Sequence, residues 1–199
     1  MRQLLVGVTL ACTLFACSTR DRANEASTTR TAAEGAAPSI YPLRVALEDQ
    51  RAQAIGLDVH RGHPTIVSMF YGSCPVACPL IISRIKEIES QLPEPARRDV
   101  RVLLVSFDGE RDTPGALAGI MKLRGLDSAR WTLARGSDDA ARQIAAVLGI
   151  SYRAAPGGAI DHDSVLTVLD REGRPLARTD DPYSDLQPLR TSIIASSPH

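Results

Sequence analysis

The sequence predicts an α/β domain with a mixed central sheet and helices on both faces. Two nearly continuous apolar runs, residues 64–70 and 100–107, have the pattern of strands that are buried on both sides. Apolar side chains recur at helical spacing over residues 79–92, so the three segments form a βαβ unit with parallel strands and a right-handed crossover. Within residues 165–179, two short apolar runs flank an Arg-Glu-Gly turn and predict an antiparallel hairpin. Parallel and antiparallel strands in one chain indicate a mixed sheet.

Caps and chain breakers mark the remaining elements. A Thr-Pro pair marks the start of a helix over residues 113–124. A serine marks the start of a second helix, over residues 137–148, and a glycine marks its end. Residues 131–133 are expected to form a short strand between these helices, and the last helix covers residues 184–195. Residues 154–159 contain one proline and two glycines and are expected to form a flexible loop.

The N-terminal part of the chain has the composition of an export signal followed by a tether. Residues 1–16 combine Arg2 with an apolar stretch that is short for a membrane span, as in a signal peptide. The stretch ends in Leu-Phe-Ala-Cys17, which resembles a bacterial lipobox and implies cleavage before Cys17 and lipidation of its thiol. Residues 17–37 lack apolar periodicity and are expected to be a flexible tether, which leaves residues 38–199 as one domain.

This pattern places the domain outside the cytoplasm. We expect a membrane-anchored lipoprotein that faces the periplasm or the outer side of the cytoplasmic membrane, with simple secretion or an uncleaved anchor as the alternatives.

The composition excludes some classes of function. The 23 lysines and arginines balance the 23 aspartates and glutamates. The chain therefore has no net positive charge that would attract nucleic acid or an anionic membrane. A hydrophobic content of 44% is too high for a disordered protein. We expect a monomer that finds its partner through local shape and that does not bind nucleic acid.

Of the four cysteines, only Cys74 and Cys78 lie in the predicted domain. They follow the strand over residues 64–70 and open the helix over residues 79–92, at the end of an α/β sheet where ligands bind. A spacing of four brings both sulfurs to one face of a helical turn, and the helix N-terminus favours the thiolate. Such a pair can form a structural disulfide, exchange electrons with another dithiol or bind a soft metal, and the spacing alone leaves all three open.

His162 is the second candidate for chemistry. It lies in a predicted loop just before the apolar run that begins at residue 165, and the glycines upstream would let it approach and leave a metal. A histidine in a loop is most often a solvated side chain, but an imidazole and two thiolates together suit copper. Zinc accepts the same ligands. His60 and His63, three residues apart, are a weaker candidate for a second metal site.

Other residues of interest are expected to be structural. Asp108, Arg111 and Asp112 are expected to form a cap and an ion-pair network that holds their loop beside the cysteines, with docking of a partner as the alternative. Met69 and Trp131 are expected to pack in the core.

Three motifs together resemble the Sco/SenC family. The sequence CPVACP at residues 74–79 resembles the family's CPxxCP signature, and SFDGERDTP at residues 106–114 is similar to its Ser-x-Asp-Pro-x-x-Asp-Thr-Pro loop. The pair Asp161-His162, followed by an apolar strand, resembles its third motif. The three motifs occur in the family's order, and the resemblance covers most of residues 43–195.

The resemblance implies a thioredoxin-like fold and a membrane-tethered copper protein. The family's copper ligands match Cys74, Cys78 and His162, with one copper ion per chain. The family delivers copper to the binuclear copper centre of cytochrome c oxidase, or keeps the cysteines of that centre reduced. The expected partners are therefore a copper-enzyme subunit such as that of cytochrome c oxidase, and the membrane. Two positions depart from the family pattern: Val76 replaces a common acidic residue and Gly109 replaces a proline.

The function that the sequence predicts is a copper metallochaperone, which is not an enzyme. The alternative is a thiol–disulfide oxidoreductase that uses Cys74 and Cys78 to reduce cysteines of an exported partner. Such reductases usually have two residues between the cysteines and a cis-proline that faces them. Here three residues separate the cysteines, and no proline lies between Gly158 and Ser164. Only the chaperone needs His162.

Overall fold

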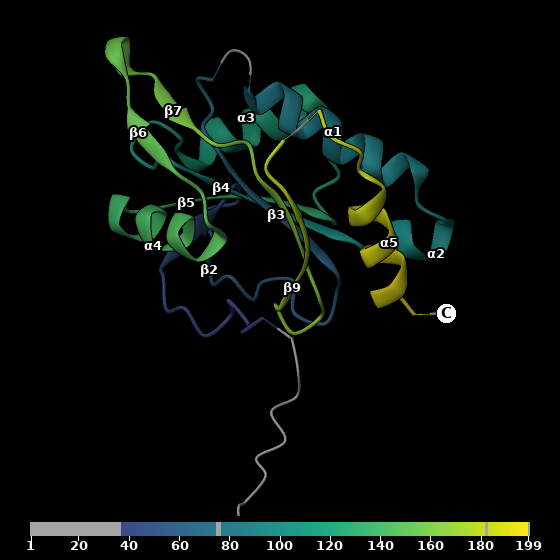
Figure 1. The fold of residues 1–199 in the computed structure, drawn as a ribbon. Coiled ribbons are helices and arrows are strands. Elements are labelled where there is room, and N and C mark those ends of the chain that lie inside the picture. Colours follow the sequence, from purple (N-terminus) through teal and green to yellow (C-terminus); the bar gives the residue numbers. More distant parts are fainter. Residues whose placement is uncertain (1–36, 75–76, 182, 199) are drawn as a thin grey trace, which may run out of the picture. The chain divides into compact units, whose positions relative to one another are not determined.

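A seven-stranded mixed sheet forms the centre of the protein (Figure 1). The computed structural model describes residues 37–74, 77–181 and 183–198. The strand order is β2-β1-β5-β4-β3-β8-β9, with β3, β4 and β5 parallel and the other pairs antiparallel. The strands of this sheet are β1 (Leu47–Asp49), β2 (Ala54–Ile55), β3 (Thr65–Phe70), β4 (Arg101–Ser106), β5 (Trp131–Gly136), β8 (Leu166–Leu169) and β9 (Pro175–Thr179).

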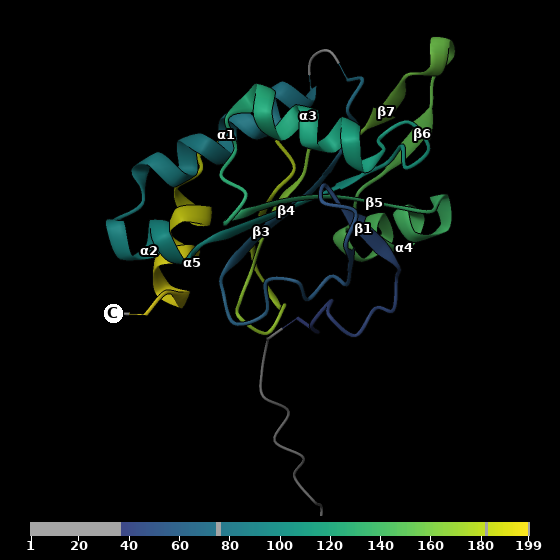
Figure 2. The same ribbon diagram turned by 180° about the vertical axis from the view of Figure 1, so that it is seen from behind.

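The helices cover both faces of the sheet. They are α1 (Ala77–Gln91), α2 (Glu94–Asp99), α3 (Pro114–Arg124), α4 (Asp138–Leu148) and α5 (Gln187–Ser196). In both views α1 and α3 lie on one face and α4 lies on the other (Figures 1 and 2). Helix α5 packs against β8 and β9 and also contacts α1. The predicted fold class, a mixed sheet with helices on both faces, is confirmed.

The centre of the sheet is buried because its strands are apolar along their whole length. Every residue of β3 is buried, and the strand pairs in parallel with β4 and antiparallel with β8. Both predicted strands of the βαβ unit and the C-terminal hairpin are confirmed. Trp131 and Met69 are each 1% exposed, so their expected places in the core are confirmed as well.

The predicted caps lie where the sequence indicates. The Thr113 hydroxyl accepts a hydrogen bond from Ala116 N at the start of α3, and the Ser137 hydroxyl accepts one from Ala140 N at the start of α4. Gly149 ends α4 in the left-handed conformation, with a φ of 62°.

Several element boundaries differ from the prediction. Helix α1 begins at Ala77, two residues earlier than expected, since a proline in the first turn removes only an amide that has no helical partner. Helix α5 begins at Gln187, three residues later, because Ser184 N and Tyr183 N donate to Asp181 in a turn. Helix α2 and the short strands β1 and β2 were not predicted, because they have too few residues for an apolar period to stand out.

The segment before β8 is a hairpin and not the flexible loop expected there. Strand β6 (Tyr152–Ala154) and strand β7 (Ile160–His162) pair with each other in a separate two-stranded sheet. We call Tyr152–His162 the β6–β7 hairpin. His162 is therefore the last residue of a strand, which corrects its predicted place in a loop. The reason is backbone pairing: Tyr152 lies opposite His162 in the ladder, so the glycines form the tip of a hairpin.

The expectations for the signal peptide, the lipobox at Cys17 and most of the tether fall on residues outside the described part of the chain. Within residues 37–74, 77–181 and 183–198, no helix is long and apolar enough to cross a lipid bilayer.

Candidate metal centre

Cys74 lies in the loop that joins β3 to α1, at the carboxyl end of the central strand. Its side chain is buried, and its backbone amide donates to Tyr71 O over 3.1 Å. Cys78 is the second residue of α1, but its side chain lies outside the described part of the structure. The loop therefore places Cys74 directly before the N-terminus of a long helix, where the helix dipole favours a thiolate.

His162 packs against two aromatic rings, and one of them belongs to Tyr71, the first residue of the loop that carries Cys74. The imidazole stands edge-on to the ring of Tyr71, with 5.7 Å between centroids, and its centroid lies 4.8 Å from that of Phe107. Phe107 in turn packs against Tyr152 at 4.7 Å. Tyr71 thus contacts Cys74 through its backbone and His162 through its ring, so two of the three predicted ligands share one neighbour.

The Nε2 atom of His162 is available to accept a hydrogen bond or to bind a metal ion. The Nδ1 atom lies 2.9 Å from Asp163 O, and a carbonyl oxygen only accepts, so Nδ1 is the donor of this bond, and in the neutral imidazole Nε2 then has the lone pair. The Nε2 atom is buried, and no hydrogen-bond partner for it is present among the described residues. A buried imidazole lone pair without a donor is costly. This atom has the chemistry of a metal ligand, and Cys74 on the adjoining loop offers a soft second ligand.

Asp112 holds the cysteine loop to the second motif. Its carboxylate accepts a hydrogen bond of 2.8 Å from Gly72 N and another from the hydroxyl of Ser106, and the residue is only 4% exposed. A Cβ atom on Gly72 would lie 2.4 Å from Asp112 Oδ1, so the close approach requires glycine there. The structure therefore ties Asp112 to the loop two residues before Cys74.

Asp108 and Arg111 form an ion pair beside this anchor. The Arg111 Nε atom pairs with Asp108 Oδ2, and the Arg111 guanidinium also donates to Gly158 O over 2.8 Å. The backbone amide of Asp108 donates to Ser106 Oγ over 2.9 Å. Of the three charged residues predicted to support the site, Asp112 contacts the cysteine loop and Arg111 contacts the hairpin that carries His162.

The glycine that departs from the family pattern has a steric reason in this chain. A Cβ atom on Gly109 would lie 2.0 Å from Gly136 O, so the backbones of the second motif and of β5 approach too closely for any side chain. Arg135 Nη1 also donates to Gly109 O over 2.7 Å. A proline ring does not fit at this position. The other departure, Val76, lies outside the described residues.

His60 and His63, the other two histidines in the described part of the chain, do not belong to a group of side chains arranged to hold a metal ion. His63 Nδ1 lies 2.7 Å from Asp99 Oδ1, and Asp99 also pairs with Arg171. Burial, together with the nearby Arg101 charge, lowers the pKa of His60 to about 4. Among the described residues, no group of three or more His, Cys, Asp and Glu side chains is arranged to hold a metal ion.

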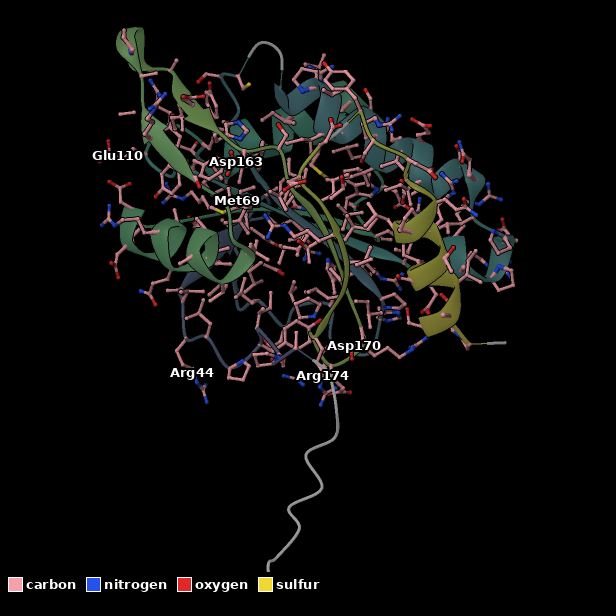
Figure 3. The ribbon with its side chains drawn as sticks, in the orientation of Figure 1. Arg44, Met69, Glu110, Asp163, Asp170 and Arg174 are labelled. Carbon is pink, nitrogen blue, oxygen red and sulfur yellow. The ribbon has the colours of Figure 1, made fainter. Side chains whose placement is uncertain are left out.

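The sequence did not assign a role to Tyr71 or Phe107, although Tyr71 lies three residues before the first quoted motif and Phe107 lies inside the second. Each directly follows a buried strand, β3 or β4, and these strands are parallel neighbours. Residues that follow neighbouring parallel strands meet at one edge of the sheet, and that signal was available. Figure 3 shows the same edge: Asp163 and Glu110 lie there, whereas Arg44, Asp170 and Arg174 lie at the opposite end.

The fold and this site define a thioredoxin-like protein in which a cysteine-bearing strand–helix loop meets a histidine from a later hairpin. The SCO1/SenC family model matches residues 43–193, and the chain belongs to that family.

Similar proteins agree with this assignment. A relative from Stutzerimonas stutzeri, described as "Putative copper-binding protein", is 29% identical over 119 residues, which are 59% of this chain and 56% of the relative. Copper-bound ScoI from Arabidopsis thaliana superposes with a TM-score of 0.66 at 18% identity, covering 76% of this chain and 94% of that one. A SCO1/SenC family lipoprotein from Bacillus anthracis gives a TM-score of 0.69 at 14% identity, covering 77% and 94%. At these identities the two structures support the fold alone.

Proposed function

We propose that this protein is a metallochaperone that binds one copper ion through Cys74, Cys78 and His162 and passes it to an exported copper protein. The observation that carries the proposal is the buried Nε2 atom of His162, which has no hydrogen-bond partner among the described residues and lies on the aromatic cluster that begins the Cys74 loop. The family membership and the name of the Stutzerimonas relative support copper as the cargo.

The donor set fits a carrier. Two thiolates and one imidazole are soft and borderline ligands that suit copper, and three ligands leave room for an incoming one. A thiolate of the recipient can therefore bind the ion before the carrier's own ligands let go. His162 is on a hairpin outside the main sheet, so one ligand is not fixed to the rigid core.

The recipient that the family resemblance favours is the binuclear copper centre of cytochrome c oxidase, or a similar exported copper enzyme. We further propose that Cys17 is lipidated and that residues 17–37 tether the monomeric domain of residues 38–199 to the membrane, on the periplasmic or outer side. The lipobox pattern supports the anchor, and so does the existence of a lipoprotein among its structural relatives.

The test is a copper titration of the full chain carrying Cys12→Ser and Cys17→Ser, so that Cys74 and Cys78 are its only thiols. The protein is reduced, freed of reductant under anaerobic conditions and titrated with Cu(II). Stoichiometry and thiolate-to-Cu(II) charge-transfer absorption are recorded. We expect one tight site per chain. His162→Ala should weaken binding by more than the roughly 10–100-fold that follows when only a ligand's supporting partner is removed.

Asp161→Ala is the matched control, because Asp161 is the neighbouring residue of β7 and points to the other face of the strand. Its ion pair with Arg153 is exposed, and its loss should leave copper affinity unchanged. Absence of tight one-to-one binding in the parent protein overturns the proposal. Rapid turnover of a partner's disulfides by the metal-free protein would favour the oxidoreductase instead.

A further inference from the structure

The β6–β7 hairpin depends on contacts outside itself. Its two strands have three residues each and pair only with each other in the described part of the chain. A lone two-stranded hairpin is marginally stable in water. Its tip turns through Gly157 and Gly158, which both have positive φ, of 75° and 78°. The position of His162 at the end of β7 is therefore set by whatever holds the hairpin in place.

Two kinds of contact hold the strands of the hairpin. Phe107 packs against Tyr152 and His162, and Tyr71 Oη accepts a hydrogen bond of 3.3 Å from Ile160 N. These contacts support the strands but do not reach the tip. They leave the tip free to pivot unless something else ties it.

Arg111 makes the contact at the tip. Its guanidinium donates to Gly158 O over 2.8 Å, while its Nε atom pairs with Asp108. Asp108 is well fixed, because its side chain is only 13% exposed and its amide donates to Ser106 Oγ. A planar guanidinium can serve both acceptors at once, which an ammonium group does less well. A continuous chain of contacts thus runs from the buried end of β4 to the hairpin tip.

We infer that Arg111 is a positioning residue that latches the tip of the β6–β7 hairpin and thereby slows the release of copper by His162. The inference rests on the proposed copper function. Gly158 is at the tip and leads into β7, which ends at His162, so freeing the tip lets β7 move and lets the imidazole leave the metal more often. Arg111 itself is not a ligand, and its side chain is about half exposed. Breaking this contact should raise the rate of copper release clearly while leaving the free energy of unfolding nearly unchanged.

The first test needs no metal. Amide hydrogen exchange is measured in the copper-free full chain with Arg111→Ala and with Arg111→Lys. We expect Arg111→Ala to speed exchange of the Ala155 and Ile160 amides about tenfold, as loss of a charge-assisted hydrogen bond would. Arg111→Lys should give a smaller increase. Amides of β3 and β4 should not change. Unchanged exchange at the hairpin in both variants overturns the latch.

The second test measures release of Cu(I) from the loaded full chain, with Cys12 and Cys17 replaced by serine, to an excess of a Cu(I) chelator. Arg111→Ala should release copper about tenfold faster. Arg153→Ala is the matched control, because this exposed arginine of the same hairpin pairs only with Asp161 of that hairpin among the described residues, and its release rate should stay within about twofold.

The two tests separate the two ideas. Faster hairpin exchange with unchanged copper release overturns the role of the latch in retaining copper, while the copper site itself stands. Failure of the parent chain to bind copper overturns the proposed function and leaves the hydrogen-exchange result to decide whether the latch exists.

Discussion

The carboxylate of Asp112 accepts a hydrogen bond of 2.8 Å from the backbone amide of Gly72, and this bond joins the second motif to the loop that carries Cys74. The same carboxylate accepts from Ser106 at the end of β4. One buried side chain therefore fixes the cysteine loop relative to the sheet.

Replacing Asp112 by alanine should destabilise the protein and loosen the cysteine loop. The change leaves Gly72 N and Ser106 Oγ without their acceptor, so we expect the free energy of unfolding to fall by about 2–4 kcal/mol. Asp112→Asn keeps one acceptor oxygen and should cost roughly half as much. Chemical denaturation measures both. A loss below about 0.5 kcal/mol for Asp112→Ala, the range of an ordinary surface substitution, would contradict this role.

Gly109→Ala should be clearly destabilising although it adds one methyl group. The new Cβ would lie 2.0 Å from Gly136 O, so backbone has to move, and we expect a cost of about 1–3 kcal/mol. Gly119→Ala is the matched control, because a Cβ there meets nothing within 4 Å and α3 gains helix propensity. That variant should be stabilised by roughly 0.5–1 kcal/mol. Equal effects of the two substitutions would refute the steric explanation.

His60 should make the protein less stable as the pH falls below neutral. Burial lowers the pKa of the folded-state His60 to about 4, against an ordinary value of 6.5. Between these values the unfolded chain binds a proton that the folded chain does not, so stability rises with pH through this window and is lost on acidification. The contribution is on the order of 2–3 kcal/mol. His60→Gln should reduce the difference between the free energies of unfolding at pH 7 and pH 4. If the free energy of unfolding depends on pH as strongly in the variant as in the parent protein, this histidine is not the cause.

Tyr71 should support His162 through its ring more than through its hydroxyl group. Tyr71→Phe keeps the edge contact with the imidazole and loses the hydrogen bond from Ile160 N, so copper affinity should change by no more than about threefold. Tyr71→Ala removes the ring and should cost about 3–5 kcal/mol of stability and weaken copper binding markedly. Copper titration and thermal unfolding are measured for both variants. Equal losses of copper affinity in Tyr71→Phe and Tyr71→Ala would contradict a role for the ring.

The sequence predicted those features that depend on long apolar patterns. The strands β3 and β4 and the helix between them are apolar over many residues, so their pairing could be inferred before the structure. The β6–β7 hairpin could not, because its strands have three residues each and alternate weakly. Contacts with Phe107 and Arg111, which are distant in the chain, hold the hairpin against the rest of the protein. Tertiary contacts of this kind leave little trace in local sequence.

The candidate site was predicted by residue type and motif, and so was part of its support, the three charged residues of the second motif. Cys74 and His162 were named from their chemistry. The steric requirement at Gly109 depends on Gly136 and could be seen only once β5 was placed beside the second motif. The expected network of Asp108, Arg111 and Asp112 divides in the structure into a loop anchor and a hairpin contact.

The position of β3 between β4 and β8 also sets an order of assembly. Thr65 pairs with Arg101 on one side and with Leu169 on the other, so the central strand is completed only when a segment from late in the chain arrives. His162 lies just before that segment. A growing chain therefore presents Cys74 and Cys78 well before His162, and long-range pairing of this kind is slow. In the proposed copper site, the two thiols would then be present for an interval before the imidazole that completes their ligand set.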